Sequence, residues 1–330
     1  MIPLSIRRGG LRRSIRPREG KTVRTIIALA FVVLCASAAA AEVVNVEFKF
    51  TPFTGDPEND DAVKTVAGTA RVFLNQVPYA EQEVSEGEAP VMFEEREIAP
   101  SVWLPVASCG PALRHGKNTV RVEFEPADPE APYHAQFSWA SVLDETTEES
   151  EPGHYAATNQ ADEGMEDREA KGTVVFEREF QADFAEDLPW HHYPVVTALT
   201  DADRQALAEL VARRVAAFAP DFQQVYALLE GSGDIQVEEV KKAKCLDQAW
   251  AAGLRIAAAP PADIEFVTTG NPEVVVRAKE GILFSPTDPA VFEKIEDEDM
   301  QMCALVTLGT VFPPKLVVVR GPKGEWVVVY

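Results

Sequence analysis

The sequence predicts a multidomain protein in which an antiparallel β domain precedes an α+β domain. Between residues 42 and 184, apolar residues mostly alternate with polar ones, which is the period expected of strands. From residue 200 onward the period first becomes helical and then returns to that of strands. A short apolar run near the start of the chain precedes both regions and is typical of an export signal.

Residues 1–41 have the layout of a bacterial signal peptide. The apolar run at 26–41, IIALAFVVLCASAAAA, follows a basic flank and ends in small residues, so we expect cleavage before Glu42. Its 16 residues fall short of the roughly 20 that a membrane-spanning helix needs. We therefore predict a periplasmic or secreted protein with no membrane span in the mature chain. The basic flank is long, and a start at Val23 would shorten it to Arg24.

Residues 42–184 are predicted to form an antiparallel β-sandwich of the immunoglobulin-like or jelly-roll kind. The strand-like segments are rich in Val, Phe and Thr and are separated by turn formers; they lie at 43–51, 65–75, 102–106, 118–126, 133–143 and 172–184. The turn His115-Gly116-Lys117-Asn118, which leads into the next strand, resembles a strand entry of jelly-roll carbohydrate-binding modules. That resemblance covers a single turn and implies architecture only.

Residues 144–171 interrupt the first domain with an acidic stretch. Ten Asp and Glu residues face only Arg168 and Lys171, and few apolar residues lie between them. Low hydrophobicity and high charge do not offset the entropy lost on ordering, so we predict a disordered insertion. A calcium-binding loop is the alternative, but its spaced Asp ligands and glycine are absent, and no metal site is predicted.

A linker at 185–199 is predicted to lead into an α+β domain at 200–330. Thr200 and Asp203 indicate an N-cap with an acidic first turn. Helices are expected from there to Pro220, at 222–231 and at 237–252, and strands at 264–269, 274–278, 282–285, 300–312, 316–320 and 326–330. Helices followed by an antiparallel sheet imply helices on one face of that sheet. This order resembles NTF2-like or cystatin-like rolls, which implies fold and no function.

The negative charge of the chain argues against nucleic acids and anionic lipid surfaces as partners. Of its 31 basic residues and 53 acids, 23 bases and 52 acids lie beyond residue 41, a difference of −29. Nucleic acids and anionic lipids both need clustered Lys and Arg for binding. We therefore expect no nucleic-acid partner. The sequence contains no recognisable cofactor motif, and no cofactor is predicted.

The linker segment Trp190-His191-His192-Tyr193 is the strongest candidate contact segment. We interpret it as an aromatic plug that seats the first domain on the second; a ligand-contacting aromatic site is the alternative. Successive side chains of an extended chain point to opposite sides, so the two histidines are not expected to bind one metal ion. The other tryptophans beyond the export signal lie within apolar patterns and are predicted to be core: Trp103, Trp139, Trp250 and Trp326.

Three cysteines follow the export signal. Cys245 and Cys303 lie in one predicted domain, and we predict a disulfide between them, worth roughly 4 kcal/mol in the chain-entropy model. Three buried thiols are the alternative. Cys109 lies in the other domain, where it would pair with His115 if it were a nucleophile. A buried structural cysteine is the commoner case.

No catalytic residue is predicted, because the sequence contains no G-x-S-x-G elbow or other reactive constellation. The favoured function is non-catalytic binding of a protein or glycan partner at a site between the domains. One alternative is an exported hydrolase acting on envelope or extracellular polymers, with loop carboxylates or with Ser101 or Ser108 near predicted strand ends. The other is a structural role in envelope assembly.

Overall fold

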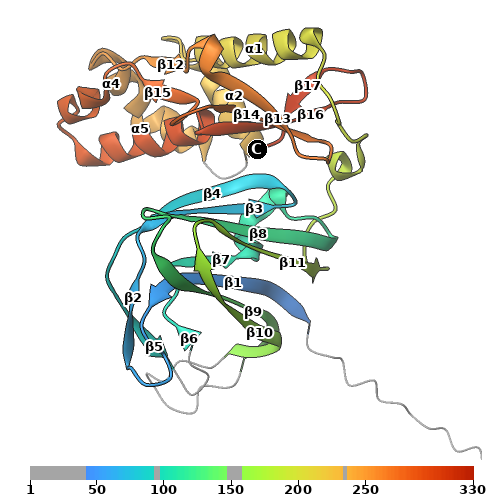
Figure 1. Cartoon of the computed structure of the whole chain (residues 1–330). Helices are drawn as coiled ribbons and strands as arrows, with labels where there is room; N and C mark the ends of the chain where they lie inside the picture. The colour runs from blue at the N-terminus through green and yellow to red at the C-terminus, as the bar shows by residue number, and fades with distance from the viewer. Residues whose placement is uncertain (1–41, 93–96, 147–157, 233–235) are drawn as a thin grey trace, which may run out of the picture. The chain divides into compact units, whose positions relative to one another are not determined.

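Antiparallel sheets make up most of the computed structural model, and all α-helices of its described residues lie after residue 200 (Figure 1). The structure describes residues 42–92, 97–146, 158–232 and 236–330. The predicted signal peptide at 1–41 lies outside this part of the chain. Within the described ranges, no helix is long and apolar enough to cross a membrane. All of the described residues belong to one compact unit, and a domain boundary at 185–199 stays a prediction.

Two antiparallel sheets account for the strands up to Ala182. Among the described residues, the first sheet has seven strands in the order β10-β9-β1-β2-β5-β6, with β7 also paired to β1. These strands are β1 (Val43–Thr54), β2 (Ala62–Thr65), β5 (Glu88–Met92), β6 (Glu97–Ile98), β7 (Val102–Pro105), β9 (Pro132–Thr146) and β10 (Thr158–Lys171). The second sheet, in the order β11-β8-β3-β4, contains β3 (Gly68–Leu74), β4 (Val77–Val84), β8 (Gly116–Pro126) and β11 (Val174–Ala182).

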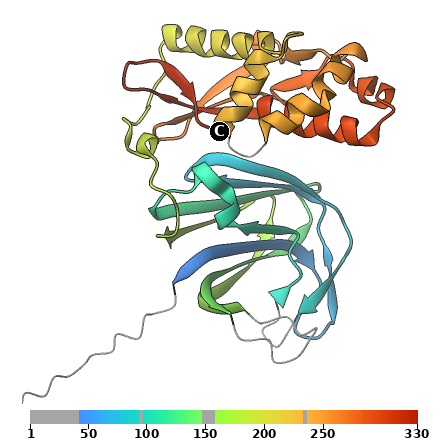
Figure 2. The same cartoon turned by 180° about the vertical axis from the view of Figure 1, so that it is seen from behind.

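Side chains from both sheets form one hydrophobic core. Figures 1 and 2 show the backbones of these two sheets. In β1, Phe48 and Phe50 are buried on either side of Lys49, which points to the opposite face. The ring centroid of Phe50 lies 5.7 Å from that of Phe124 in β8 and 6.0 Å from that of Phe176 in β11. The face of the β1 sheet that bears Lys49 is therefore turned away from the core, and we call it the outer face.

β10 forms where the sequence predicts disorder. It pairs with β9 along most of its length. The Arg168 guanidinium lies 4.3 Å from the ring centroid of Phe176 and donates to the Glu166 carboxylate at 2.7 Å. Backbone hydrogen bonds to β9 and the stacked arginine offset the entropy that β10 loses on ordering. Amino-acid composition shows neither of these contacts and therefore did not predict the strand. Residues 144–146, which end β9, and residues 158–171 are thus ordered, whereas residues 147–157 of the predicted disordered insertion lie outside the described ranges.

Five α-helices lie among the described residues of the second region: α1 (Asp201–Ala216), α2 (Gln223–Ser232), α3 (Val237–Ala243), α4 (Cys245–Ala251) and α5 (Glu298–Val311). α1 begins at a capping box, in which the Asp203 amide donates to Thr200 Oγ1 at 3.2 Å and the Thr200 amide donates to the Asp203 carboxylate at 3.0 Å. The single helix predicted at 237–252 is divided, because Lys244 adopts a left-handed backbone with a φ of 58°.

The helices pack on one face of a four-stranded antiparallel sheet. Its order is β13 (Ile264–Thr268), β14 (Glu273–Ala278), β16 (Lys315–Arg320) and β17 (Trp326–Val328). Val274 and Val276 in β14 join the helices in one hydrophobic cluster. Val275 and Val317 point to the other face, where they cluster with Val77 of β4. This sheet is therefore buried on both faces by different parts of the chain.

Two predicted strands differ from the structure. The segment at 282–285 does not join the four-stranded sheet; its end forms β15 (Phe284–Pro286), which pairs with β12 (Ile256–Ala258). The segment at 300–312 belongs to α5. The Asp297 carboxylate caps this helix by accepting from the amides of Asp299 (3.0 Å) and Met300 (3.2 Å). The run is apolar on most sides, so its period does not separate helix from strand, although its length favours a helix.

A disulfide links two of the helices. It joins Cys245, the first residue of α4, to Cys303 in α5, with the two Cα atoms 6.0 Å apart. Cys109 is a free, buried thiol. The cross-link closes a loop that contains the whole β12–β15 segment.

We expect reduction of this disulfide to lower the melting temperature, because opening such a loop costs about 4 kcal/mol in the chain-entropy model. Thermal unfolding with and without reductant, together with non-reducing peptide mapping, measures both the effect and the pairing. Cys109→Ser is the matched control and should respond to reductant as the wild type does. Alkylation of both Cys245 and Cys303 in unfolded, unreduced protein would contradict the pairing.

Candidate functional site

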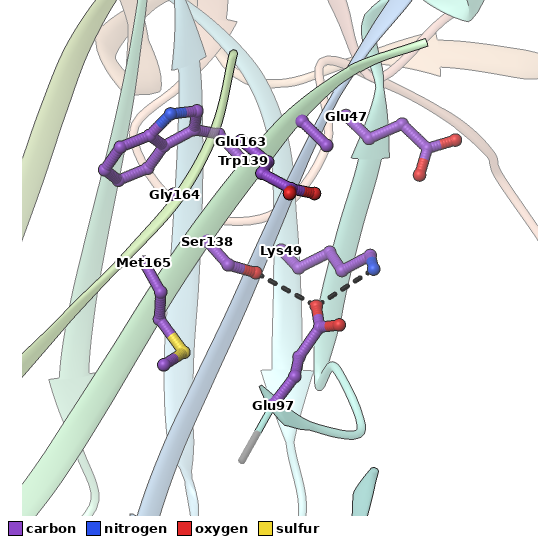
Figure 3. Close-up of a pocket in the computed structure, with 9 residues that line it drawn as sticks. Glu47, Lys49, Glu97, Ser138, Trp139, Glu163, Gly164 and Met165 are labelled. Atoms are coloured by element: carbon purple, nitrogen blue, oxygen red, sulfur yellow. Dashed lines mark hydrogen bonds and ion pairs between the residues drawn. The ribbon is translucent and has the colours of Figure 1, made fainter. Parts of the chain in front are cut away.

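The outer face of the β1 sheet carries a cavity of about 300 Å³ (Figure 3). Side chains reach it from β1, β6, β9 and β10, because strand alternation turns the polar residues of β1 away from the core. The lining residues are Glu47, Lys49, Glu97, Ser138, Trp139, Ala140, Glu163, Gly164 and Met165.

A polar network fixes the centre of this cavity. Lys49 Nζ donates to Glu97 Oε1 at 2.9 Å, and Ser138 Oγ donates to the same oxygen at 3.1 Å (Figure 3). The Lys49 and Glu97 side chains are each about three-quarters buried. Two donors on one carboxylate oxygen hold all three side chains in place, and the arrangement leaves the second Glu97 oxygen as an acceptor.

Trp103 extends the same face. It lies opposite Lys49 in the β7–β1 register, and paired residues of neighbouring strands point to the same side. Its side chain is 58 % exposed, so the prediction of a core tryptophan is wrong here. The alternation in β7 explains the difference, since Val102 and Leu104 are buried and the residue between them must point outward.

Trp139 borders the cavity from β9, but its indole ring lies on the core side, since Trp139 is the cross-strand partner of Phe48 and packs against the core cluster. The Arg178 guanidinium lies 3.6 Å from its ring centroid. On β10, Gly164 lies directly against the indole ring, and a Cβ atom at that position would be 2.4 Å from Trp139 Cζ2. Only glycine permits this approach without a shift of the ring or of β10. The close packing holds the indole ring in one orientation on the core side of β9.

Trp190, His191 and His192 of the predicted contact segment lie in a short 3-10 helix, Pro189–His192, and Tyr193 follows its end. His191 is buried, and its Nε2 lies 3.0 Å from the Pro111 carbonyl oxygen. Because a carbonyl only accepts, Nε2 carries the proton. Burial lowers the pKa of His191 below its ordinary value of 6.5; the Pro111 carbonyl opposes this shift, and the nearby Arg114 charge lowers the pKa further.

Arg114 connects this segment to the second region. Its Nη1 donates to the His191 carbonyl oxygen at 3.1 Å, and its Nη2 lies 2.5 Å and 2.7 Å from the two carboxylate oxygens of Glu273. Glu273 is almost completely buried. The Trp190 ring centroid lies 5.9 Å from that of Tyr330. Trp190 and His191 thus touch residues of both regions, and their role as a plug or as ligand contacts stays a prediction.

The two adjacent histidines have different surroundings. His192 is exposed, and its Nε2 lies 2.6 Å from Asp187 Oδ1. His192 and Tyr193 line a second cavity of about 360 Å³, which Arg320 also borders. In the described part of the chain, no group of three or more His, Cys, Asp or Glu is arranged to hold a metal ion.

Among the described residues, neither Cys109 nor Ser108, two of the residues considered as nucleophiles, is hydrogen-bonded to a histidine. Burial raises the pKa of the Cys109 thiol to about 11, which keeps it protonated at neutral pH. His115, the base proposed for Cys109, has a different partner, because its Nδ1 lies 3.2 Å from the Ala185 carbonyl oxygen. Ser108 Oγ donates to the Pro105 carbonyl oxygen at 2.6 Å.

The outer-face cavity was not found from the sequence. Glu47, Lys49, Glu97 and Ser138 are ordinary polar residues of strands, and only the pairing of β1 with β9 and the fold of β6 bring them together. The alternation of β7 is the one local signal that identifies Trp103. No protein-family model, curated protein or solved structure matches this chain. The site is therefore interpreted from its own geometry.

The lowered pKa of His191 makes stability depend on pH. Below about pH 6.5 the unfolded chain binds a proton that the folded chain does not, so the free energy of unfolding falls as the pH drops through that value. Urea unfolding between pH 5 and 8 measures this slope. We expect His191→Gln to flatten the slope and His192→Gln, the exposed neighbour, to leave it unchanged. Parallel profiles for the wild type and His191→Gln would contradict the assignment.

Proposed function

We propose that this chain is an exported, non-catalytic binding protein whose outer face binds a neutral glycan. The observation that carries the proposal is Trp103, which is exposed beside the fixed Lys49, Glu97 and Ser138 network. Export rests on the sequence of residues 26–41.

The chemistry of the outer face suits a sugar. An indole ring offers a broad, flat, rigid contact area for the apolar face of a sugar ring, and orientationally fixed polar groups select hydroxyls. The Ser138 hydroxyl and the second Glu97 oxygen are such groups. Glu47 and Glu163 add negative charge to the cavity, which disfavours uronates and sulfated sugars.

The finer fold assignments belong to the same proposal. The aromatic core between the two antiparallel sheets supports a sandwich, of which the jelly-roll form occurs in lectins. Helices on one face of the β13–β17 sheet support an NTF2-like or cystatin-like roll. In this account the second region supplies a scaffold, and the first region supplies the glycan site.

An exported hydrolase is the second candidate, because Glu47, Glu97 and Glu163 line one cavity. Most glycosidases use a pair of carboxylates. In this cavity, however, Lys49 and Ser138 both occupy the same oxygen of Glu97. That arrangement suits a fixed binding contact better than a group that must exchange protons with a substrate.

Screening the purified protein against neutral and acidic glycans tests the proposal. We expect binding of neutral members, and we expect Trp103→Ala to weaken it about tenfold or more, which corresponds to about 1.4 kcal/mol of lost contact. Calorimetric titration of the best glycan provides the measurement.

Met302→Ala is the matched control, since Met302 is a large apolar residue of similar exposure, 59 %, on α5. It should bind as the wild type does. The double variant Trp190→Ala/Tyr193→Ala separates the outer face from the linker segment. Loss of binding in that double variant but not in Trp103→Ala would move the site to the linker, and release of new reducing ends from a bound glycan would favour the hydrolase.

A further inference from the structure

A cavity of about 810 Å³ lies where β3 and β4 meet the start of β16 and the turn after β14. Four basic side chains line it: Arg71, Arg277, Lys279 and Lys315. The chain as a whole has 53 acids and 31 bases. A local gathering of four bases therefore runs against its composition.

Two of these bases are direct neighbours. Arg277 in β14 is the cross-strand partner of Lys315 in β16. Like charges placed directly opposite each other destabilise a sheet. The positive charge of Arg277 is neutralised on the side away from Lys315, where its Nε donates to Glu265 Oε1 at 2.6 Å.

The positive charge of Lys315 is not neutralised in this way. Its Nζ donates to the Tyr79 carbonyl oxygen at 2.8 Å, and no carboxylate of the described residues forms an ion pair with it. Burial, with the charge of Arg277 added, lowers the pKa of Lys315, and Glu81 opposes this only in part. A half-buried ammonium without an anionic partner costs stability, which an anion bound beside it would recover.

The other charges of the cavity leave room for an anion. Arg71 is already paired with Glu81 at 3.0 Å and with Glu125 at 2.9 Å. Lys279 donates to the Ala262 carbonyl oxygen at 2.7 Å. Glu81 and Glu280 both border the cavity, and Glu280 offsets one of these bases. The unneutralised positive charge is therefore centred on Lys315.

The walls of the cavity define the rest of the ligand. Apolar groups, including those of Phe73, Pro78, Ile282 and Pro314, form about half of them. Ile282 is 51 % exposed, although it is a large aliphatic residue. We propose that this cavity binds an organic anion, with its carboxylate or phosphate head on Lys315 and its apolar body against these walls. The volume lies in the range of small-molecule sites.

This site is independent of the glycan site. It involves β3, β4, β14 and β16, whereas the proposed glycan site involves β1, β6, β7, β9 and β10. A Trp103→Ala variant should consequently bind the organic anion as the wild type does. The two proposals can fail separately.

Calorimetric titration of the full chain with benzoate, hexanoate, phenyl phosphate and inorganic phosphate tests the proposal. Benzyl alcohol serves as the uncharged probe. We expect millimolar or tighter binding of the organic anions, weakening with added salt, and weaker binding of inorganic phosphate and of the alcohol. A preference for phenyl phosphate over benzoate would identify the head group as phosphate.

The decisive variant is Lys315→Met, which keeps the apolar stem and removes the charge. We expect it to fold, since it also removes the repulsion with Arg277, and to lose binding about tenfold or more. Lys315→Arg should retain binding, and Lys64→Met, an exposed lysine of β2, is the neutral control. Equal affinity of the wild type and Lys315→Met, equal binding of benzoate and benzyl alcohol, or no binding of any anion would overturn the proposal.

Discussion

The buried ion pair between Arg114 and Glu273 is the contact on which the arrangement of the described chain depends. Glu273 is 1 % exposed, and its carboxylate would be very costly to bury without a partner. Arg114 precedes β8, and the Asn118 side chain holds it there by accepting from its amide at 2.9 Å and donating to its carbonyl at 2.6 Å. The same guanidinium holds the His191 carbonyl. One side chain thus ties the start of β8, the linker segment and β14 together.

Weaker contacts extend this junction along the turn between β3 and β4. Asn271 Nδ2 donates to the Asn75 carbonyl oxygen at 2.7 Å, and Val77 packs against Val275 and Val317. Lys315 is linked to β4 by its hydrogen bond to the Tyr79 carbonyl oxygen. At one end of the junction Arg114 forms a buried ion pair with Glu273. At the other end the Lys315 ammonium is hydrogen-bonded to a carbonyl oxygen and not to a carboxylate of the described residues. A ligand there would bind to both regions and stabilise their contact.

Local patterns of the sequence predicted local structure. The alternation in β1 and the capping box of α1 each depend on a few neighbouring residues, and both are read directly from the chain. The register that places Ser138 and Trp103 beside Lys49 depends on strands far apart in sequence, which no local pattern encodes. A strand was predicted where α5 forms, because the run at 300–312 is apolar on most sides and its pattern fits both a helix and a strand. β10 was not predicted, because the composition of residues 158–171 carries no information about their backbone pairing with β9.

A double-mutant cycle on Arg114→Met and Glu273→Leu, followed by urea unfolding, tests the central claim most directly. Each single change should cost about 3–5 kcal/mol, since it leaves a buried charge unpaired, and the double change should cost clearly less than the two together. The same cycle on the exposed pair Lys117 and Glu179 should show coupling below about 1 kcal/mol. Additive and equally small effects at Arg114 and Glu273 would contradict the claim that this pair holds the two regions together.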